Sequence, residues 1–469
     1  MTTAPVAGTL DAAVHRFHEL LGQEDSARAT HHRLRDGQRA AGLTPGGRLL
    51  SHVLRPRFMS DTEHARVCAD GARLTDAIHR LAAHALRTGA AGDLVRQHLA
   101  LTPEETALAG TAPLTGPFTQ ESRLDGFRTA DRTAFVEYNS HSPVGIVSQD
   151  LLCDIWAGVP VMETFRREYR VEAVPGCRWT ADSLVSAWRT GGAPGGEPHV
   201  AVVDWESGFA WEFEALRAEL QGRGVPAVVC SPDDLHYETG RGLYTRDPDG
   251  RRRPITVVHR RVLLNDLLSR YGHTLTDHPL TRAWAAGACV MVNPYTSHLA
   301  HKKSVLALLT DPRAGDLLPE PEAAAARELV PWTRLVRAGT TTCPDGHRTD
   351  LMTLARDRRD RLVLKPNDDY GGRGVLFGWE TTDREWQAAL GRALLSPHVV
   401  QERVTIPTAS YPVLVRGRLR AEEYAESTDP FLFGADSPGC ISRLSRTSLL
   451  NVSAGGCVAA VFRVAPRTP

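Results

Sequence analysis

The sequence has no C-x-x-C pair, no apolar run of membrane-spanning length and no excess of either charge. Its eight cysteines are widely scattered, which excludes a zinc ribbon or a thioredoxin-type motif and is typical of small buried side chains in a reducing compartment. No segment approaches the about 18–20 apolar residues of a membrane span. The first residues also lack the basic-then-apolar pattern of a secretory signal. We therefore expect a cytoplasmic protein that is not held in a membrane.

The charges of the chain balance: lysine plus arginine and aspartate plus glutamate both number 55. A formal net charge of zero gives no general attraction toward nucleic acid or an anionic membrane. Neither is therefore an expected partner.

Both familiar phosphate-binding motifs, G-x-x-x-x-G-K-[ST] and G-x-G-x-x-G, are missing from the most distinctive segment of the chain, residues 362–375. There a short β-type run delivers Lys365 and is followed by a loop that contains Tyr370, Gly371, Gly372, Arg373 and Gly374. A lysine at a strand end can meet a phosphate, and glycines let backbone N–H groups approach phosphate oxygens. The segment indicates a nucleotide site of another kind, or else a hairpin turn, since Gly-Gly pairs are also frequent in turns.

The remaining periodicity predicts a mixed α/β protein of two to three domain-sized units. Residues 9–110 have helical spacing of apolar side chains, whereas residues 134–139 alternate as in a strand. Residues 199–204, 211–220, 225–230 and 255–259 read as strand, helix, strand and strand of a small parallel sheet. Residues 288–294 predict a buried strand that leads to a helix carrying Lys302 and Lys303.

Three oxygen-bearing side chains predict a metal site. Glu137 and Asn139 are two apart on one strand, so they face the same side, and Asp125 lies where the neighbouring strand of a hairpin is expected. Two carboxylates and an amide oxygen suit Mg²⁺, which prefers one or two carboxylates plus phosphate oxygens. A polar edge strand with no metal is the other interpretation.

Further segments are compatible with nucleotide contacts, and each has an ordinary structural alternative. Lys303 and Lys365 form a pair next to β-type runs, although Lys303 alone also fits a helix surface. The run 399–404 is either a core strand or a strand whose main chain pairs with an adenine edge. Arg443, with the glycine-rich turn that contains Asn451, can hold a terminal phosphate.

Together these segments resemble the ATP-grasp superfamily, and in particular its circularly permuted branch that includes glutathionylspermidine synthase. The resemblance covers about residues 50–464, and its most specific part is the run from Arg123-x-Asp125 to Glu137-Tyr138-Asn139, which continues into Ser140-His141-Ser142-Pro143. Ordinary ATP-grasp ligases end with such a Glu-x-Asn element. Here it precedes the lysines, as a circular permutation requires.

The resemblance implies a role for each matching residue. Asp125, Glu137 and Asn139 would hold Mg²⁺, two ions in all, and Arg123 and Arg443 would act on the transferring phosphoryl group. The ATP-binding residues would be Lys303, Lys365, the loop Tyr370, Gly371, Gly372, Arg373 and Gly374, the adenine-facing Gln401, Glu402 and Val404, and Asn451.

The resemblance also implies four parts of a circularly permuted ATP-grasp fold. They are an N-terminal helical region (1–112), the permuted metal-binding element (113–190), a small parallel-sheet pre-ATP-grasp-like domain (191–300) and the nucleotide-binding lobes (301–469). The Asp-x-Arg that some relatives carry before the Arg443 region has no counterpart here, because Asp429-Pro430-Phe431 lacks the arginine. That departure weakens any role carried over to Asp429.

The activity implied is ATP-dependent ligation of a small-molecule carboxylate to an amine, of the amino acid, peptide or polyamine class, through an acyl phosphate. The alternatives are a kinase on the same fold, which stops after phosphoryl transfer, and a non-catalytic nucleotide-binding protein. No Ser-His-Asp or Cys-His arrangement is needed, since ATP-grasp ligases use no protein nucleophile.

Overall fold

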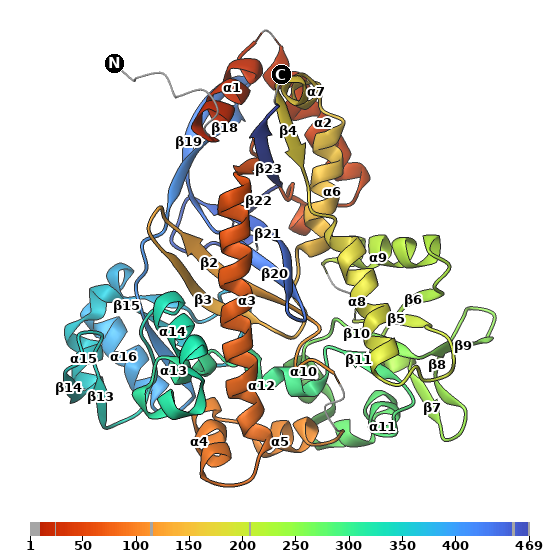
Figure 1. The fold of residues 1–469 in the computed structure, drawn as a ribbon, viewed down its shortest axis with the longest axis vertical. Helices are drawn as coiled ribbons and strands as arrows, with labels where there is room; N and C mark the ends of the chain where they lie inside the picture. Colours follow the sequence, from red (N-terminus) through yellow and green to blue (C-terminus); the bar gives the residue numbers. More distant parts are fainter. Residues whose placement is uncertain (1–9, 24, 113–115, 206–207, 453–454, 468–469) are drawn as a thin grey trace.

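A seven-stranded sheet in the middle of the protein joins two distant parts of the sequence (Figure 1). The computed structural model describes residues 10–467 except residues 24, 113–115, 206–207 and 453–454. The strand order is β18-β19-β21-β20-β2-β3, with β22 paired to β21. The strands are β2 (Glu121–Arg128), β3 (Thr133–Asn139), β18 (Thr408–Val415), β19 (Arg418–Glu426), β20 (Asp429–Phe433), β21 (Asp436–Ser445) and β22 (Cys457–Ala459). The early hairpin β2–β3 thus lies beside strands from the end of the chain.

Helix α3 (Asp61–Ala83) crosses this sheet and contacts β20 and β21 (Figure 1). Ser60 caps its N-terminus, because the Ser60 side chain accepts a hydrogen bond from the Glu63 amide. Leu74, Ile78 and Leu81 are completely buried on its inner face. They pack in one core with Leu124 and Phe135 of the β2–β3 hairpin, so α3 supports the hairpin from behind.

A four-stranded antiparallel sheet forms a separate lobe, with the order β12-β17-β15-β16. Its strands are β12 (Thr333–Leu335), β15 (Leu362–Pro366), β16 (Leu376–Phe377) and β17 (His398–Glu402). Helices α15 (Leu351–Asp357) and α16 (Asp383–Ala393) pack against Leu362, Leu364 and Val400 of the sheet. The alternate residues Lys365, Val399 and Gln401 therefore face the opposite side.

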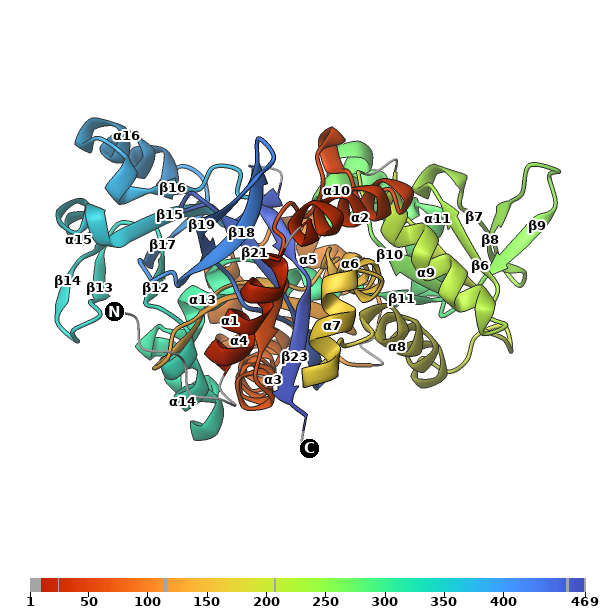
Figure 2. The same ribbon diagram turned by 90° about the horizontal axis from the view of Figure 1, so that it is seen from above.

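The predicted parallel sheet is confirmed. Its order is β11-β10-β5-β6, and all its neighbouring strands are parallel. The strands are β5 (Val200–Val203), β6 (Ala227–Cys230), β10 (Val257–Arg260) and β11 (Val290–Val292). Figure 2 shows this sheet at one end of the protein and the β12–β17 lobe at the other. The four predicted part boundaries remain a prediction.

Smaller sheets and helices complete the described chain. The smaller strands are β1 (Arg57–Met59), β4 (Tyr169–Glu172) and β23 (Val461–Pro466), then β7 (His236–Glu238), β8 (Gly242–Arg246) and β9 (Arg252–Ile255), and the hairpin β13 (Thr340–Thr342) and β14 (Arg348–Asp350). The other α-helices are α1 (Leu10–Leu21), α2 (Ser26–Ala40), α4 (Ala90–Leu99), α5 (Pro103–Ala109), α6 (Ile146–Ala157), α7 (Pro160–Glu168), α8 (Gly176–Thr190), α9 (Ala210–Gly222), α10 (Leu264–Tyr271), α11 (Pro279–Ala285), α12 (His298–His301), α13 (Ser304–Leu309) and α14 (Glu320–Leu329). No helix of these described ranges is long and apolar enough to cross a membrane.

The helix predicted to carry Lys302 and Lys303 is interrupted at those residues, so that prediction was wrong. Helix α12 ends at His301 and α13 begins at Ser304. Lys302 has non-helical dihedral angles, φ −57° and ψ 127°. Asn367 holds the break, because its carbonyl accepts from the Lys303 amide at 2.9 Å and its side chain accepts from the Ser304 amide at 2.8 Å.

Candidate active site

The β2–β3 hairpin places the predicted metal-binding residues on one face. Asp125 lies directly opposite Glu137, and Arg123 directly opposite Asn139. Opposed residues in an antiparallel pair point to the same face, as do residues two apart on one strand. The four side chains are thereby brought together, with a register shift immediately after Asp125.

Asp125 accepts from three of the predicted residues. Arg123 Nε and Asn139 Nδ2 donate to its Oδ1 at 2.9 and 3.0 Å, and Arg443 Nη2 lies 2.9 Å from its Oδ2. Burial disfavours the charged form of Asp125, but the two arginines outweigh it and hold the pKa of this carboxyl well below its usual range. Asp125 is therefore an ionised, oriented oxygen donor.

Asp429 is the residue that sequence reasoning undervalued. Arg443 donates from Nε to Asp429 Oδ2 at 2.8 Å, while Gly126 N and Ser427 Oγ also donate to this carboxylate. The side chain of Asp429 is fully buried, and that burial raises its pKa despite the nearby arginine. Asp429 thus holds the guanidinium of Arg443 in place without the Asp-x-Arg pattern of the relatives, and no local sequence signal marks this pairing.

Glu137 faces the first predicted ATP lysine. Lys303 Nζ lies 3.0 Å from Glu137 Oε1 and donates to the Asp369 carbonyl at 2.6 Å. Burial opposes ionisation of Glu137, yet the nearby Lys303 and Lys365 lower its pKa. The predicted metal-binding face and the lysine pair are therefore adjacent in the fold, although about 165 residues separate Glu137 from Lys303 in the sequence.

Lys365 is a buried ammonium group whose partners are neutral oxygens. It donates to Gln401 Oε1 at 2.7 Å and to the Val136 carbonyl at 3.1 Å. Burial, the largest cause, and the positive charge of Lys303 lower the pKa of Lys365 to about 8. A cation held this way gains from an arriving anion, which suits a phosphate-binding role.

The run predicted to face adenine lies at the end of β17. Gln401 accepts from Lys365 and donates to Thr333 Oγ1 at 3.0 Å. The backbone amides of Glu402 and Arg403 donate to the carbonyls of Trp332 and Arg361. Val404 lies beyond the end of β17. A contact between its main chain and adenine remains a proposal.

The glycine-rich run forms a tight turn next to Lys365. Gly371, Gly372 and Gly374 have φ of 70°, 75° and 68°, a region that favours glycine. A Cβ on Gly372 would lie 2.8 Å from Leu449, and one on Gly374 would lie 2.7 Å from Pro366. The loop must therefore be glycine-rich to adopt this conformation.

Two side-chain contacts close this turn. The Asn451 amide donates to the Gly371 carbonyl, and the Arg373 guanidinium lies 4.8 Å from the centre of the Tyr370 ring. In this structure Asn451 therefore contacts the loop, and its predicted triphosphate contact remains a proposal.

We expect ATP to protect this loop from trypsin, which cleaves after arginine. A lid over the phosphates opens for exchange and closes on the bound nucleotide. A non-hydrolysable ATP analogue with Mg²⁺ should slow cleavage at Arg373 at least fivefold, while cleavage at the exposed Arg251, in a distant turn, stays the same. Mass spectrometry of the early fragments measures both rates, and equal cleavage at Arg373 with and without the analogue would show an ordinary turn.

A buried cluster that the sequence did not reveal lies beside the lysine pair. Lys302 donates to Glu105 Oε1 and to Asp368 Oδ2, each at 2.7 Å, and His298 Nε2 lies 2.8 Å from Glu105 Oε1. Two carboxylates and an imidazole are ligands that a metal ion can use. Here the Lys302 ammonium already supplies the positive charge between the carboxylates, so the cluster serves to fix the chain break before Lys303.

The comparisons with known proteins concern the fold and part of the sequence. No family model matches the chain. The structure of a glutathione synthetase-like effector from Globodera pallida superposes with a TM-score of 0.58 at 12% identity, covering 94% of this chain and 98% of that one. This similarity extends over nearly the whole chain, and the protein has the ATP-grasp fold that its sequence predicted. The early β2–β3 hairpin lies beside β20, from the end of the chain.

Two curated bacterial proteins match part of the chain. "Putative glutamate–cysteine ligase 2-3" of Frankia alni is 28% identical over 234 residues, which is 48% of this chain and 24% of that protein. "Putative glutamate–cysteine ligase 2-2" of Frankia casuarinae is 28% identical over 272 residues, or 56% and 29%. The chain thus spans less than a third of the length of these relatives.

Proposed function

We propose that this protein is an ATP-dependent ligase that joins a carboxylate to an amine through an acyl phosphate. The observation that supports the proposal is that Lys303 and Lys365 lie next to the face of the hairpin that carries Asp125 and Glu137. Ionised carboxylates beside buried cations are the two kinds of group needed to bind a metal–nucleotide complex. The fold similarity and the partial match to proteins named for glutamate–cysteine ligase activity support the same reaction class.

The residues present fit magnesium. Asp125 and Glu137 are ionised carboxylates with lowered pKa values, and Asn139 adds an amide oxygen. This all-oxygen donor set is the one Mg²⁺ prefers. Bound here, Mg²⁺ would neutralise charge on the β- and γ-phosphates.

The basic residues of the site then have two different roles at the phosphates. Lys303 and Lys365 bind the α- and β-phosphates, exchanging their present oxygen partners for phosphate oxygens. Arg123 and Arg443 stabilise the negative charge of the phosphoryl group as the substrate carboxylate attacks it. The 370–374 turn excludes water, which would otherwise hydrolyse the acyl phosphate before the amine arrives.

A substrate panel tests this proposal. Purified protein with ATP and Mg²⁺ is offered pairs of amino acids, peptides and polyamines, beginning with glutamate as the carboxylate because of the curated relatives. We expect ADP release that requires both a carboxylate and an amine, and a conjugate whose mass equals their sum minus water. ADP release with a single substrate and no conjugate would contradict ligation.

A further inference from the structure

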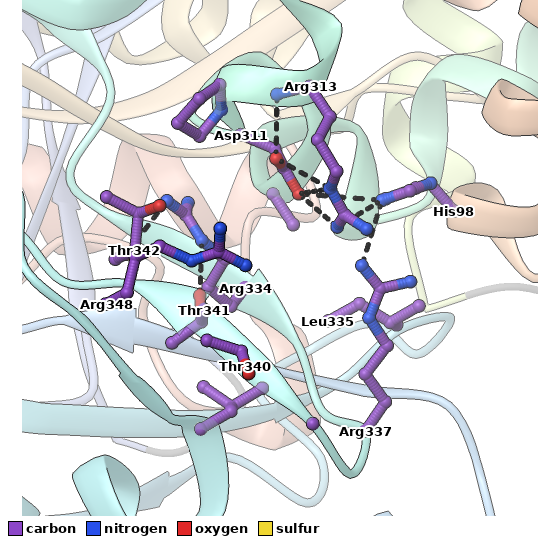
Figure 3. A pocket seen from close by; sticks show the side chains of 14 residues that line it. His98, Asp311, Arg313, Arg334, Leu335, Arg337, Thr340, Thr341, Thr342 and Arg348 are labelled. Carbon is purple, nitrogen blue, oxygen red and sulfur yellow. Dashed lines mark hydrogen bonds and ion pairs between the residues drawn. The ribbon is translucent and has the colours of Figure 1, made fainter.

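A second basic site lies in the β12–β17 lobe, outside the residues assigned to ATP. It is a cavity of ≈ 340 Å³ between α4, α13, the 3₁₀ helix η6 (Pro312–Leu317), β12 and the β13–β14 hairpin (Figure 3). Its lining contains none of the predicted ATP or metal residues. A volume in this range accommodates a small organic molecule.

Four arginines dominate the lining, namely Arg313, Arg334, Arg337 and Arg348. Figure 3 shows them extending from several walls around the same space. The acidic residue of the lining is Asp311, and its carboxylate already has partners. Arg313 Nε lies 3.1 Å from its Oδ1, and His98 Nε2 lies 3.6 Å from its Oδ2. The cavity therefore keeps a net positive charge from the other three arginines.

Arg334 is buried in this wall, and none of its hydrogen-bond partners among the described residues is a carboxylate. It is 6% exposed and donates to the carbonyls of Thr333 and Thr342 and to the hydroxyls of Thr310 and Thr341, at 2.7–3.2 Å. Burial lowers the pKa of Arg334 to about 10, and the nearby charge of Asp311 only partly opposes this shift. An anion in the cavity would add a negative charge beside this buried guanidinium.

Arg337, in the loop after β12, and Arg348, on β14, complete the cationic surface. Arg337 Nη2 lies 3.4 Å from His98 Nε2, which is a weak contact between two basic side chains. Arg348 is exposed on the β13–β14 hairpin. Both side chains can turn onto a ligand without breaking a buried ion pair.

We propose that this cavity binds a small molecule that carries a phosphate group. Arg334, Arg337 and Arg348 have no carboxylate partner in the described part of the chain. Three such guanidinium groups match a doubly charged anion better than a single carboxylate, and guanidinium forks bind phosphate through paired hydrogen bonds. The threonine hydroxyls of β13 add neutral donors at the same wall. The space exceeds what a lone phosphate group fills, so the phosphate is carried on a larger body.

The nucleotide is one source of phosphate, and a separate phosphorylated molecule is the other. The ligand is expected to bind here independently of Lys365, because the cavity and the predicted ATP site share no residue. Helix α13 begins directly after Lys303 of the predicted ATP site, and its Ala307 lines the cavity.

Calorimetric titration with pyrophosphate, without Mg²⁺, tests the site. The double variant Arg337→Ala/Arg348→Ala should lower the pyrophosphate affinity at least tenfold. The matched control Arg384→Ala/Arg392→Ala removes two exposed arginines from α16 of the same lobe and should leave the affinity within twofold. Citrate, an anion without phosphate, should bind at least tenfold more weakly than pyrophosphate.

Three results would overturn the proposal. They are no pyrophosphate binding by the wild-type protein, an affinity unchanged by Arg337→Ala/Arg348→Ala, and citrate binding as tight as pyrophosphate binding. If Lys365→Met abolishes all pyrophosphate binding while the arginine pair has no effect, the anion occupies the nucleotide site alone and the cavity assignment is wrong. Neither arginine forms an ion pair with a described residue, so unchanged thermal unfolding is the expected check on folding.

Discussion

Changing Glu137 to Gln should reduce turnover at least about 100-fold, equivalent to roughly 2.7 kcal/mol of transition-state stabilisation, while ATP affinity changes less than about tenfold. The amide oxygen of Gln still accepts from Lys303, which lies 3.0 Å from the carboxylate, so the local fold is kept. What is lost is a negative charge that would help hold Mg²⁺ against the phosphates. Losing this charge raises the energy of the transition state most, because charge is redistributed there.

Steady-state turnover and calorimetric ATP titration separate the two effects. Glu328→Gln serves as the matched control, because Glu328 is half exposed and pairs with Arg73 on the surface. The control should retain full activity. Near-wild-type turnover of Glu137→Gln would mean that the Glu-x-Asn element is not a metal site.

Removing the Arg443 side chain should destabilise the fold and abolish activity. Arg443 is only 17% exposed and lies between Asp125 and Asp429, with distances of 2.9 and 2.8 Å. Arg443→Ala leaves the fully buried Asp429 carboxylate without its counter-ion, a change that typically costs about 3–5 kcal/mol. The midpoint of urea unfolding should fall accordingly.

Two further variants identify the cause of that loss. Arg446→Ala removes an exposed arginine that pairs with Glu422 from the same region, and should cost less than about 1 kcal/mol. Adding Asp429→Asn to Arg443→Ala should recover part of the stability, because the buried charge is gone, but none of the activity. If Arg443→Ala unfolds at the wild-type urea concentration, Arg443 is not held by a buried ion pair.

The elements next to the site could be predicted because each is encoded locally. The apolar run before Lys365 forms β15, alternation at 134–139 forms β3, and Asp125 pairs with Glu137 across the expected hairpin. The glycines of the 370–374 turn have the positive φ values that such a run permits. Chain order also indicated the permuted fold, since the Glu-x-Asn element precedes the lysines.

Features that depend on distant contacts could not be read from the sequence. Asn367 holds the chain break at Lys302, and Glu105 binds the Lys302 side chain there. By itself Glu105 looks like an ordinary helix-capping residue, and it does accept a hydrogen bond from the Thr102 amide. Asp429 lies fourteen residues before Arg443, in a run that reads only as a buried strand. The basic cavity gathers arginines from β12, η6 and β14, and none of them belongs to a recognisable motif.

Hydroxylamine capture tests the central claim, ligation through an acyl phosphate, most directly. Hydroxylamine attacks the carbonyl carbon of an acyl phosphate, forming a hydroxamate and releasing inorganic phosphate. With ATP, Mg²⁺ and the right carboxylate, but no amine substrate, hydroxamate should accumulate in equal amount with ADP. Arg123→Ala should abolish this capture, because the transferring phosphoryl group loses a charge-assisted contact. A stable phosphate ester as the only product, with no hydroxamate, would contradict the ligase and identify a kinase on the same fold.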